Sequence, residues 1–223
     1  MRNVFEMDFL FIFLEKLTQL VMYRSADPGT PYLTDAVAKR DSVRDLVDNF
    51  DTIRAEILQA LPSATPIQGD VFFEEDITND GLWDKLYLKW YSKPTALAQR
   101  VLPKTLQVIE RHPDIRLAMV SILKPDAVIL PHCGPWGGSV RVHLGIHTPN
   151  SPKCFIDVDG ERYSWRDGEV VAFDDTYEHF VENKTNSPRV ILFLDVERKM
   201  LDRVSQGLLS VFHSTFARLT SRE

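Results

Sequence analysis

Two histidines and an arginine in the C-terminal half of the chain have side chains suited to metal-dependent chemistry. His132 lies in the segment PHCGPWGG, His179 follows 47 positions later in FDDTYEH, and Arg189 comes ten residues after His179. Imidazoles bind transition metals such as iron, and a guanidinium binds a carboxylate through two parallel hydrogen bonds. This set predicts a small β-barrel iron site in which Arg189 holds the far carboxylate of a 2-oxo acid.

The segment around His132 departs from the usual pattern of a non-haem iron site. Such sites offer two histidines and one carboxylate, with the first two ligands commonly arranged as His-x-Asp or His-x-Glu. Gly134 stands at the carboxylate position, and glycine has no side chain with which to bind a metal. A site on His132 and His179 would therefore use two imidazoles and leave an additional position for water.

The histidine in the segment SVRVHLGI is an alternative first ligand. His143 is also followed at the second position by a glycine, and it also precedes His179. Side chains alternate between the two faces of a strand, so Arg141 and His143 would share one face. Both would then point into the mouth of the barrel, and the spacing leaves open whether His132 or His143 binds the metal.

Acidic residues near these groups have competing interpretations. Asp195 lies on the same predicted strand as Arg189 and could pair with it, because a buried guanidinium needs a carboxylate partner. Asp174 and Asp175 lie in FDDTYEH, where the sequence favours turn formation as their role. The triplet His-Pro-Asp at 112–114 contains a carboxylate, but it lies at a predicted helix end, so we assign it no metal role.

The apolar pattern divides the chain into a helical N-terminal part and a β-rich C-terminal part. Residues 34–61 and 95–111 have the apolar spacing of helices, and residues 83–91 are typical of a strand. From Leu117 onward, eight short apolar runs separated by turn residues predict a jelly roll, the double-stranded β-helix of cupin-like barrels. We therefore expect an α+β fold with three parts: N-terminal helices at 1–70, a β-helix domain at 71–198 and a C-terminal helix at 199–223.

Both ends of the chain contain amphipathic segments with two interpretations each. The apolar spacing of residues 8–23 predicts a helix that packs in the core or lies in a membrane interface. Charged residues interrupt the apolar run, so we expect neither a membrane-spanning helix nor a signal peptide. Residues 198–223 carry five basic and two acidic residues and predict a helix that docks on the barrel or touches anionic lipid. The apolar stripe of this helix consists of Leu201, Val204, Leu208, Phe212, Phe216 and Leu219.

Composition is that of an ordinary folded protein. The 223 residues are 44% hydrophobic and 26% charged, enough for one domain with a sizeable core. A net charge of −6 disfavours a nucleic-acid partner. The two cysteines, Cys133 and Cys154, provide neither a disulfide framework nor a zinc cluster, which favours a reduced, intracellular setting.

Three segments resemble the aspartyl/asparaginyl β-hydroxylase family: HCGPWGGSVRVHLGI, WRDGEVVAFDDTYEHFVEN and RVILFLDVER. Members of that family are Fe(II)- and 2-oxoglutarate-dependent dioxygenases on a double-stranded β-helix, and they bind iron with two histidines and no carboxylate. The resemblance covers roughly Trp83 to Arg198. It implies that His132 and His179 are the iron ligands. It also implies a set of 2-oxoglutarate contacts: Trp83, Ser121, Arg141, His143 and Arg189.

Further segments resemble the bacterial lipid A acyl-chain 2-hydroxylases, among them LKWY, TPNS and VDGERYSWRDGE. The related ornithine-lipid hydroxylases share much of this pattern. The resemblance implies an enzyme that uses Fe(II), 2-oxoglutarate and O2 to hydroxylate an unactivated C–H bond, at C2 of a lipid acyl chain. It also implies a cytoplasmic protein, peripheral at the inner face of the bacterial cytoplasmic membrane.

Two other functions remain open from the sequence. One is β-hydroxylation of an aspartyl or asparaginyl side chain in a peptide or of a small amide, which the lack of visible helical repeats disfavours. The other is a cupin-type binding protein without turnover, which an arginine placed to hold a 2-oxo acid disfavours. The sequence does not predict the oligomeric state.

Overall fold

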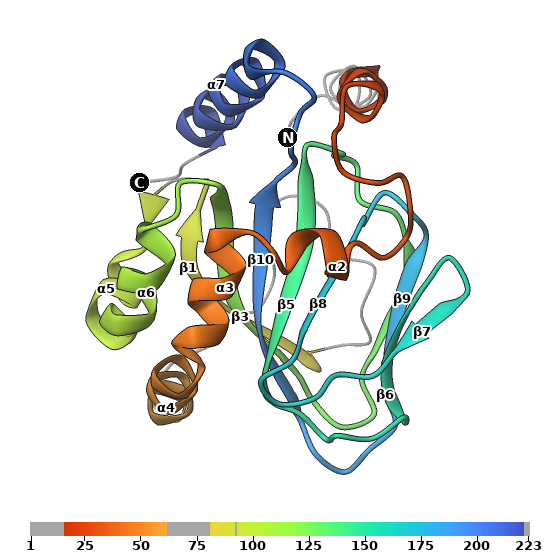
Figure 1. Cartoon of the computed structure of the whole chain (residues 1–223). Coiled ribbons are helices and arrows are strands. Elements are labelled where there is room, and N and C mark those ends of the chain that lie inside the picture. The colour runs from red at the N-terminus through yellow and green to blue at the C-terminus, as the bar shows by residue number, and fades with distance from the viewer. Residues whose placement is uncertain (1–15, 62–80, 92, 221–223) are drawn as a thin grey trace, which may run out of the picture.

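The computed structural model describes residues 16–61, 81–91 and 93–220, with the side chains of residues 216–220 left aside. A layer of helices covers one side of a β-barrel, and a further helix crosses one end of it (Figure 1). Residues 16–23 are helical. The other helices are α2 (Thr34–Val37), α3 (Asp41–Asp48), α4 (Phe50–Ala60), α5 (Ala96–Val101), α6 (Pro103–Glu110) and α7 (Arg203–Thr220).

The barrel consists of two antiparallel sheets that face each other. Its strands are β1 (Trp83–Trp90), β2 (Lys93–Pro94), β3 (Ile115–Leu123), β4 (Val128–His132), β5 (Ser139–His147), β6 (Cys154–Val158), β7 (Glu161–Tyr163), β8 (Val170–Phe173), β9 (His179–Asn183) and β10 (Arg189–Glu197). The larger sheet has the order β2-β1-β3-β10-β5-β8 and the smaller one β4-β9-β6-β7. The predicted α+β class with a double-stranded β-helix core is confirmed.

Side-chain alternation along the central strands separates an outer core from the inside of the barrel. On β10, Leu192 packs in the cluster beneath the helices, whereas Phe193 belongs to the cluster inside the barrel. On β5, Arg141 and His143 line the interior, as the alternation predicted. Both faces of this sheet are therefore buried, which explains the nearly continuous apolar runs of its strands.

The outer core is formed where α3, α4 and α6 pack against the larger sheet. Leu46 of α3 and Ile53 of α4 are fully buried there. Glu56 accepts hydrogen bonds from the backbone N–H groups of Lys104 and Thr105, at the positive end of the α6 dipole. The triplet at 112–114 belongs to this layer, since His112 pairs with Asp45 of α3, outside the barrel.

Helix α7 is held on the barrel by a buried carboxylate at the end of β10. Four side chains donate hydrogen bonds to Glu197: Gln206, Ser210 and His213 from α7, and Arg116 from β3. Burial opposes ionisation, but the hydrogen bonds from His213 and Ser210 and the nearby Arg116 lower the pKa of Glu197 to about 2. The other ring nitrogen of His213 accepts a hydrogen bond of 2.9 Å from the Trp136 indole.

The predicted apolar stripe of the C-terminal helix packs on the barrel only in part. Leu201, Val204 and Leu208 are 66%, 73% and 67% exposed, whereas Phe212 of the same stripe packs against Trp136 at a ring distance of 4.7 Å. Leu209 and His213, which are not in the stripe, are buried. The hydrogen bonds to Glu197 fix the rotation of α7, and hydrophobic periodicity does not record such bonds. The side chains of two stripe positions lie outside the described residues: Phe216 and Leu219.

The predicted N-terminal helix is described only in part. Residues 16–23 are helical, and residues 8–15 lie outside the described part of the chain. Val21 is buried and packs with Trp136 and Leu209 of α7. Among the described residues, no helix is both long and apolar enough to cross a bilayer.

The His213 contact predicts a loss of stability in mild acid. Burial lowers the pKa of His213 below its ordinary value of 6.5, so below pH 6.5 the unfolded chain binds a proton that the folded chain does not. The free energy of unfolding should therefore fall as the pH drops below 6.5, with at most about 1.4 kcal/mol per pH unit from this residue. In His213→Asn, the free energy of unfolding, measured with urea at a series of pH values, should depend less steeply on pH, because the contribution of His213 is lost. An unchanged slope would contradict the prediction.

Candidate metal and co-substrate site

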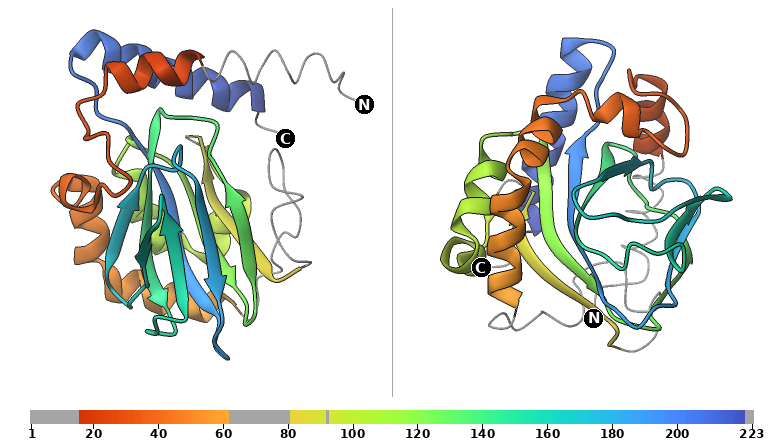
Figure 2. Two further views of the ribbon diagram at one scale, coloured as in Figure 1. Left: turned by 90° about the vertical axis from the view of Figure 1, so that its right-hand side faces the viewer. Right: turned by 60° about the horizontal axis from the view of Figure 1, so that its bottom comes forward.

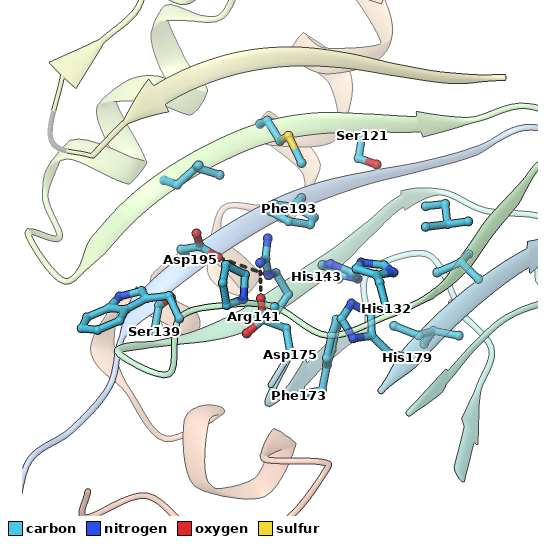
Figure 3. A pocket seen from close by; sticks show the side chains of 18 of the residues that line it. Ser121, His132, Ser139, Arg141, His143, Phe173, Asp175, His179, Phe193 and Asp195 are labelled. Carbon is cyan, nitrogen blue, oxygen red and sulfur yellow. Dashed lines mark hydrogen bonds and ion pairs between the residues drawn. The ribbon is translucent and has the colours of Figure 1, made fainter. Parts of the chain in front are cut away.

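The barrel encloses a cavity of about 240 Å³ that reaches Phe212 on the inner side of α7. Figure 3 shows how side chains from both sheets point into this space. The structure brings together every residue predicted for the site. All of the following line the cavity: Trp83, Ser121, His132, Arg141, His143, His179 and Arg189.

The two predicted metal ligands are direct cross-strand neighbours. In the antiparallel pair of β4 and β9, His132 stands opposite His179. Their ring centroids are 4.2 Å apart, with an angle of 52° between the ring planes. Rings this close can share one ion, so the pair fits a metal held by two imidazoles. His143, the alternative first ligand, lies on β5 in the facing sheet (Figure 3).

Backbone hydrogen bonds determine which ring nitrogen of each histidine faces the cavity. The Nδ1 atom of His132 is 2.8 Å from the Leu130 carbonyl, and that of His179 is 2.9 Å from the Tyr177 carbonyl. A carbonyl only accepts, so Nδ1 carries the proton and Nε2 keeps the lone pair that a metal needs. Burial, reinforced by the neighbouring His132, lowers the pKa of His179 to about 4, which keeps its ring neutral at pH 7.

A carboxylate lies against the glycine that replaces the usual third ligand. The Gly134 N–H donates to the Asp175 carbonyl at 2.6 Å, and a Cβ added at position 134 would collide with the Asp175 carboxylate. Asp174 forms the predicted turn through hydrogen bonds to Thr176, but Asp175 lines the cavity, which the sequence did not indicate. Among the described residues, no group of three or more His, Cys, Asp or Glu side chains could hold a metal ion.

The contact between Gly134 and Asp175 gives a test by substitution. Gly134→Ala should lower both thermal stability and turnover, because the new methyl group must displace the Asp175 side chain beside the histidine pair. Gly29→Ala is the matched control, since a Cβ at position 29 has no neighbour within 4 Å. Calorimetry and a turnover assay compare the two variants. Equal thermal stability and equal turnover in the two variants would show that position 134 has room for a methyl group.

Arg189 is a buried cation without an acidic partner among the described residues. It is 2% exposed, its NH2 group donates to the Ser121 hydroxyl at 2.9 Å, and its guanidinium lies 4.5 Å from the Trp165 ring centroid. The Nε atom has no hydrogen-bond partner. Burial lowers the pKa of Arg189 to about 10, so the group is still charged at pH 7. An uncompensated buried cation is costly, and an anionic ligand would remove that cost.

Asp195, which the sequence offered as a possible partner of Arg189, pairs with another arginine. It lies 3.2 Å from Arg141, and Arg141 also forms an ion pair with Asp175. The rise along a strand explains this, because six residues at about 3.3 Å each separate positions 189 and 195 by roughly 20 Å. Arg141 therefore already has two carboxylate partners in the cavity, whereas Arg189 has none in the part of the chain that the structure describes.

His143 is enclosed between the two arginines. It is 3% exposed, and neither ring nitrogen has a hydrogen-bond partner within the described part of the chain. Its ring stacks on Phe193 at a centroid distance of 5.0 Å. Burial, followed by the charges of Arg189 and Arg141, lowers the pKa of His143 well below 6.5, so the ring is neutral. A neutral imidazole buried without a partner fits a polar ligand that completes its hydrogen bonds.

Aromatic side chains form part of the cavity wall. Four of them are Tyr87, Trp90, Tyr91 and Trp136. Sequence reasoning missed Phe173 and Phe193, which flank His143. Phe193 could have been found, because it alternates in phase with Arg189 on the same strand. Phe173 follows from no comparable pattern.

Comparison with known proteins identifies the relatives of this chain. A family model described as aspartyl/asparaginyl beta-hydroxylase matches residues 47–199. The ornithine lipid ester-linked acyl 2-hydroxylase of Rhizobium tropici is 32% identical over 154 residues, which are 66% of this chain and 54% of that protein. Human aspartyl/asparaginyl beta-hydroxylase is 31% identical over 161 residues, covering 69% of this chain and 21% of its own length.

The chain spans about half the length, or less, of these curated relatives. Among solved structures, a prolyl-4-hydroxylase from Pseudomonas putida matches 74% of this chain and 97% of its own, with 14% identity and a TM-score of 0.46. The family model covers about two thirds of the chain and contains every predicted site residue. This chain is therefore a member of the aspartyl/asparaginyl β-hydroxylase family.

Proposed function

We propose that this protein is an Fe(II)- and 2-oxoglutarate-dependent dioxygenase that hydroxylates C2 of an acyl chain on lipid A or an ornithine lipid. One observation carries the co-substrate assignment. Arg189, a buried cation with no acidic partner among the described residues, lines the same cavity as His132 and His179. A diacid that reaches from the histidine pair to Arg189 would neutralise this charge.

The histidine pair supports the metal assignment. His132 and His179 would hold iron through Nε2, while their Nδ1 hydrogen bonds to backbone carbonyls fix the orientation of the rings. Bound iron supplies the oxygen chemistry needed to attack an unactivated C–H bond. The residues of this chain orient the reactants and exclude water from the cavity.

The residues around Arg189 support 2-oxoglutarate as the diacid. The Ser121 hydroxyl oxygen accepts hydrogen bonds from Arg189 and from the Trp83 indole at 2.9 and 2.8 Å. Its own proton is then directed elsewhere and could join Arg189 in binding the distal carboxylate. His143, neutral and without a partner, has one N–H donor for another oxygen of the co-substrate.

Aromatic side chains in the cavity lining support a lipid acyl chain as the substrate. Tyr87, Trp90, Trp136 and Phe212 line the same cavity as the histidine pair and offer apolar surface to an alkyl chain. The lining also includes the ion pairs of Arg141 with Asp175 and Asp195, so the apolar surface covers only part of the cavity. The Rhizobium tropici relative, an ornithine lipid ester-linked acyl 2-hydroxylase, agrees with this substrate class.

A turnover assay with defined substrates tests the proposal. The protein is supplied with Fe(II), ascorbate and 2-oxoglutarate, and succinate is measured with lipid A, an ornithine lipid or an aspartyl peptide. A lipid substrate should release succinate and gain one oxygen atom at C2 of an acyl chain by mass spectrometry. Hydroxylation of the peptide alone would replace the lipid assignment. Binding of 2-oxoglutarate without succinate from any substrate would favour a cupin-type binding protein.

A further inference from the structure

Helix α7 exposes an apolar stripe on the side that faces away from the barrel. Val204, Leu208 and Val211 follow each other at intervals of four and three residues, so they lie on one helical face. Leu201 precedes them, and the helix at 16–23 adds two further exposed apolar side chains. Six residues, between 59% and 80% exposed, form what we call the two-helix surface: Leu20, Tyr23, Leu201, Val204, Leu208 and Val211.

The two segments are joined, so these side chains belong to one surface. The Ala26 N–H donates to the Lys199 carbonyl at 2.8 Å, and the Leu201 N–H donates to the Arg24 carbonyl at 2.9 Å. The Arg24 side chain also forms an ion pair of 3.1 Å with Asp202. Figure 2 shows the helix at 16–23 and α7 side by side across one end of the barrel.

The segments that carry the two-helix surface also carry basic residues. Lys16, Arg24, Lys199 and Arg203 lie within or next to these segments in the sequence, and all four are exposed. Asp202 offsets one of these charges through its pairing with Arg24. This region is therefore positive on a protein whose net charge is −6. A positive rim around exposed apolar side chains is complementary to a surface that is both apolar and anionic.

We propose that the two-helix surface docks this protein on a bilayer containing anionic phospholipid. Apolar side chains gathered on one face of amphipathic helices, with basic residues beside them, are the pattern of helices that lie in a membrane interface. Single exposed apolar residues are common on soluble proteins, but six on two adjoining segments are not scattered. A second copy of the chain would fit less well, because both surfaces would carry positive charge.

The position of the two-helix surface connects it with the cavity. Leu209 lies on the buried side of α7, and Phe212, one turn after Leu208, lines the cavity beside Trp136 at a ring distance of 4.7 Å. Only the width of one helix, about 10 Å, then separates a docked bilayer from the cavity wall. This placement suits an enzyme that receives an acyl chain from the bilayer, while docking itself requires no turnover.

Vesicle binding without iron or 2-oxoglutarate tests the docking proposal. The full chain should co-sediment with vesicles of phosphatidylglycerol and phosphatidylcholine at least about tenfold more strongly than with phosphatidylcholine alone. Raising the salt concentration should weaken binding to the anionic vesicles. No preference for anionic vesicles, or no binding to them, would overturn the proposal.

A double variant with a matched control locates the binding surface. Val204→Asp with Leu208→Asp should reduce vesicle binding at least about tenfold, because both side chains would leave the interface and repel anionic lipid. Val47→Asp on α3 makes the same change at another exposed valine, 41% exposed, and should bind like the wild type. Equal thermal midpoints of the variants show intact folding.

Two further results would overturn the assignment of this surface. One is wild-type vesicle binding in a double variant that folds normally. The other is a wild-type dimer, measured by light scattering, that becomes a monomer in the double variant while neither protein binds vesicles. The two-helix surface would then be a contact between two copies of the chain. Because vesicle binding is measured without turnover, failure of the hydroxylase proposal would leave this result unchanged.

Discussion

Substitution of His179 by alanine is expected to reduce turnover by more than a hundredfold. The imidazoles of His132 and His179 are the two side chains that we propose as iron ligands, and their rings lie 4.2 Å apart. Loss of a residue that merely orients a metal ligand costs about 10- to 100-fold. Loss of one of two ligands should cost more, since a single imidazole would remain.

The measurement is the rate of succinate release across a range of Fe(II) concentrations. High iron should restore part of the activity if the variant only weakens metal binding. His147→Ala is the matched control, because His147 ends β5 and does not line the cavity. It should keep the wild-type rate. Wild-type turnover in His179→Ala would refute the ligand assignment, and His143 would then be the next candidate to test.

Local patterns predicted the strands and the direction of their side chains. The alternation in SVRVHLGI placed Arg141 and His143 on one face, and in the structure both line the cavity. This succeeded because the two-residue period of a strand is a local property of the chain. The helix-covered face of the same strand is apolar for the same reason, as Leu144 shows.

Strand pairing could not be predicted in this way. His132 and His179 meet because β4 pairs with β9 in a register that places them opposite each other. That register depends on contacts between segments far apart in the sequence, so spacing left His132 and His143 as equal candidates. The resemblance to a known family favoured His132, and the geometry of the ring pair agrees with it.

Polar contacts caused the errors of the sequence analysis. Asp195 was considered as a possible partner of Arg189 because both lie on one strand face, but the length of the strand separates them and Asp195 pairs with Arg141. The packing face of α7 was predicted only in part because Glu197 binds the polar side of the helix through His213 and Ser210. Hydrophobic periodicity carries no information about buried hydrogen bonds, so such errors concentrate where polar groups are buried.

Substitution of Arg189 by methionine should raise the apparent KM for 2-oxoglutarate by at least about thirtyfold. Truncating one partner of a buried, hydrogen-bonded charge pair costs about 2–5 kcal/mol, and the lower figure already corresponds to thirtyfold. The saturated rate should change much less, because the distal carboxylate is bound equally in the ground and transition states. Arg44→Met, at an exposed ion pair on α3, is the control and should leave KM unchanged.

Thermal unfolding separates this effect from damage to the fold. Without 2-oxoglutarate, Arg189→Met should have a thermal midpoint at or above that of the wild type, because it removes a buried cation that has no acidic partner among the residues with described positions. Added 2-oxoglutarate should stabilise the wild type but not the variant. An unchanged KM would mean that another residue, with Arg141 as the next candidate, binds the distal carboxylate of 2-oxoglutarate. A lower thermal midpoint in the variant would mean that Arg189 is needed for folding. The predicted combination, weaker co-substrate binding with undiminished stability, arises only if the guanidinium is kept in the barrel for a ligand.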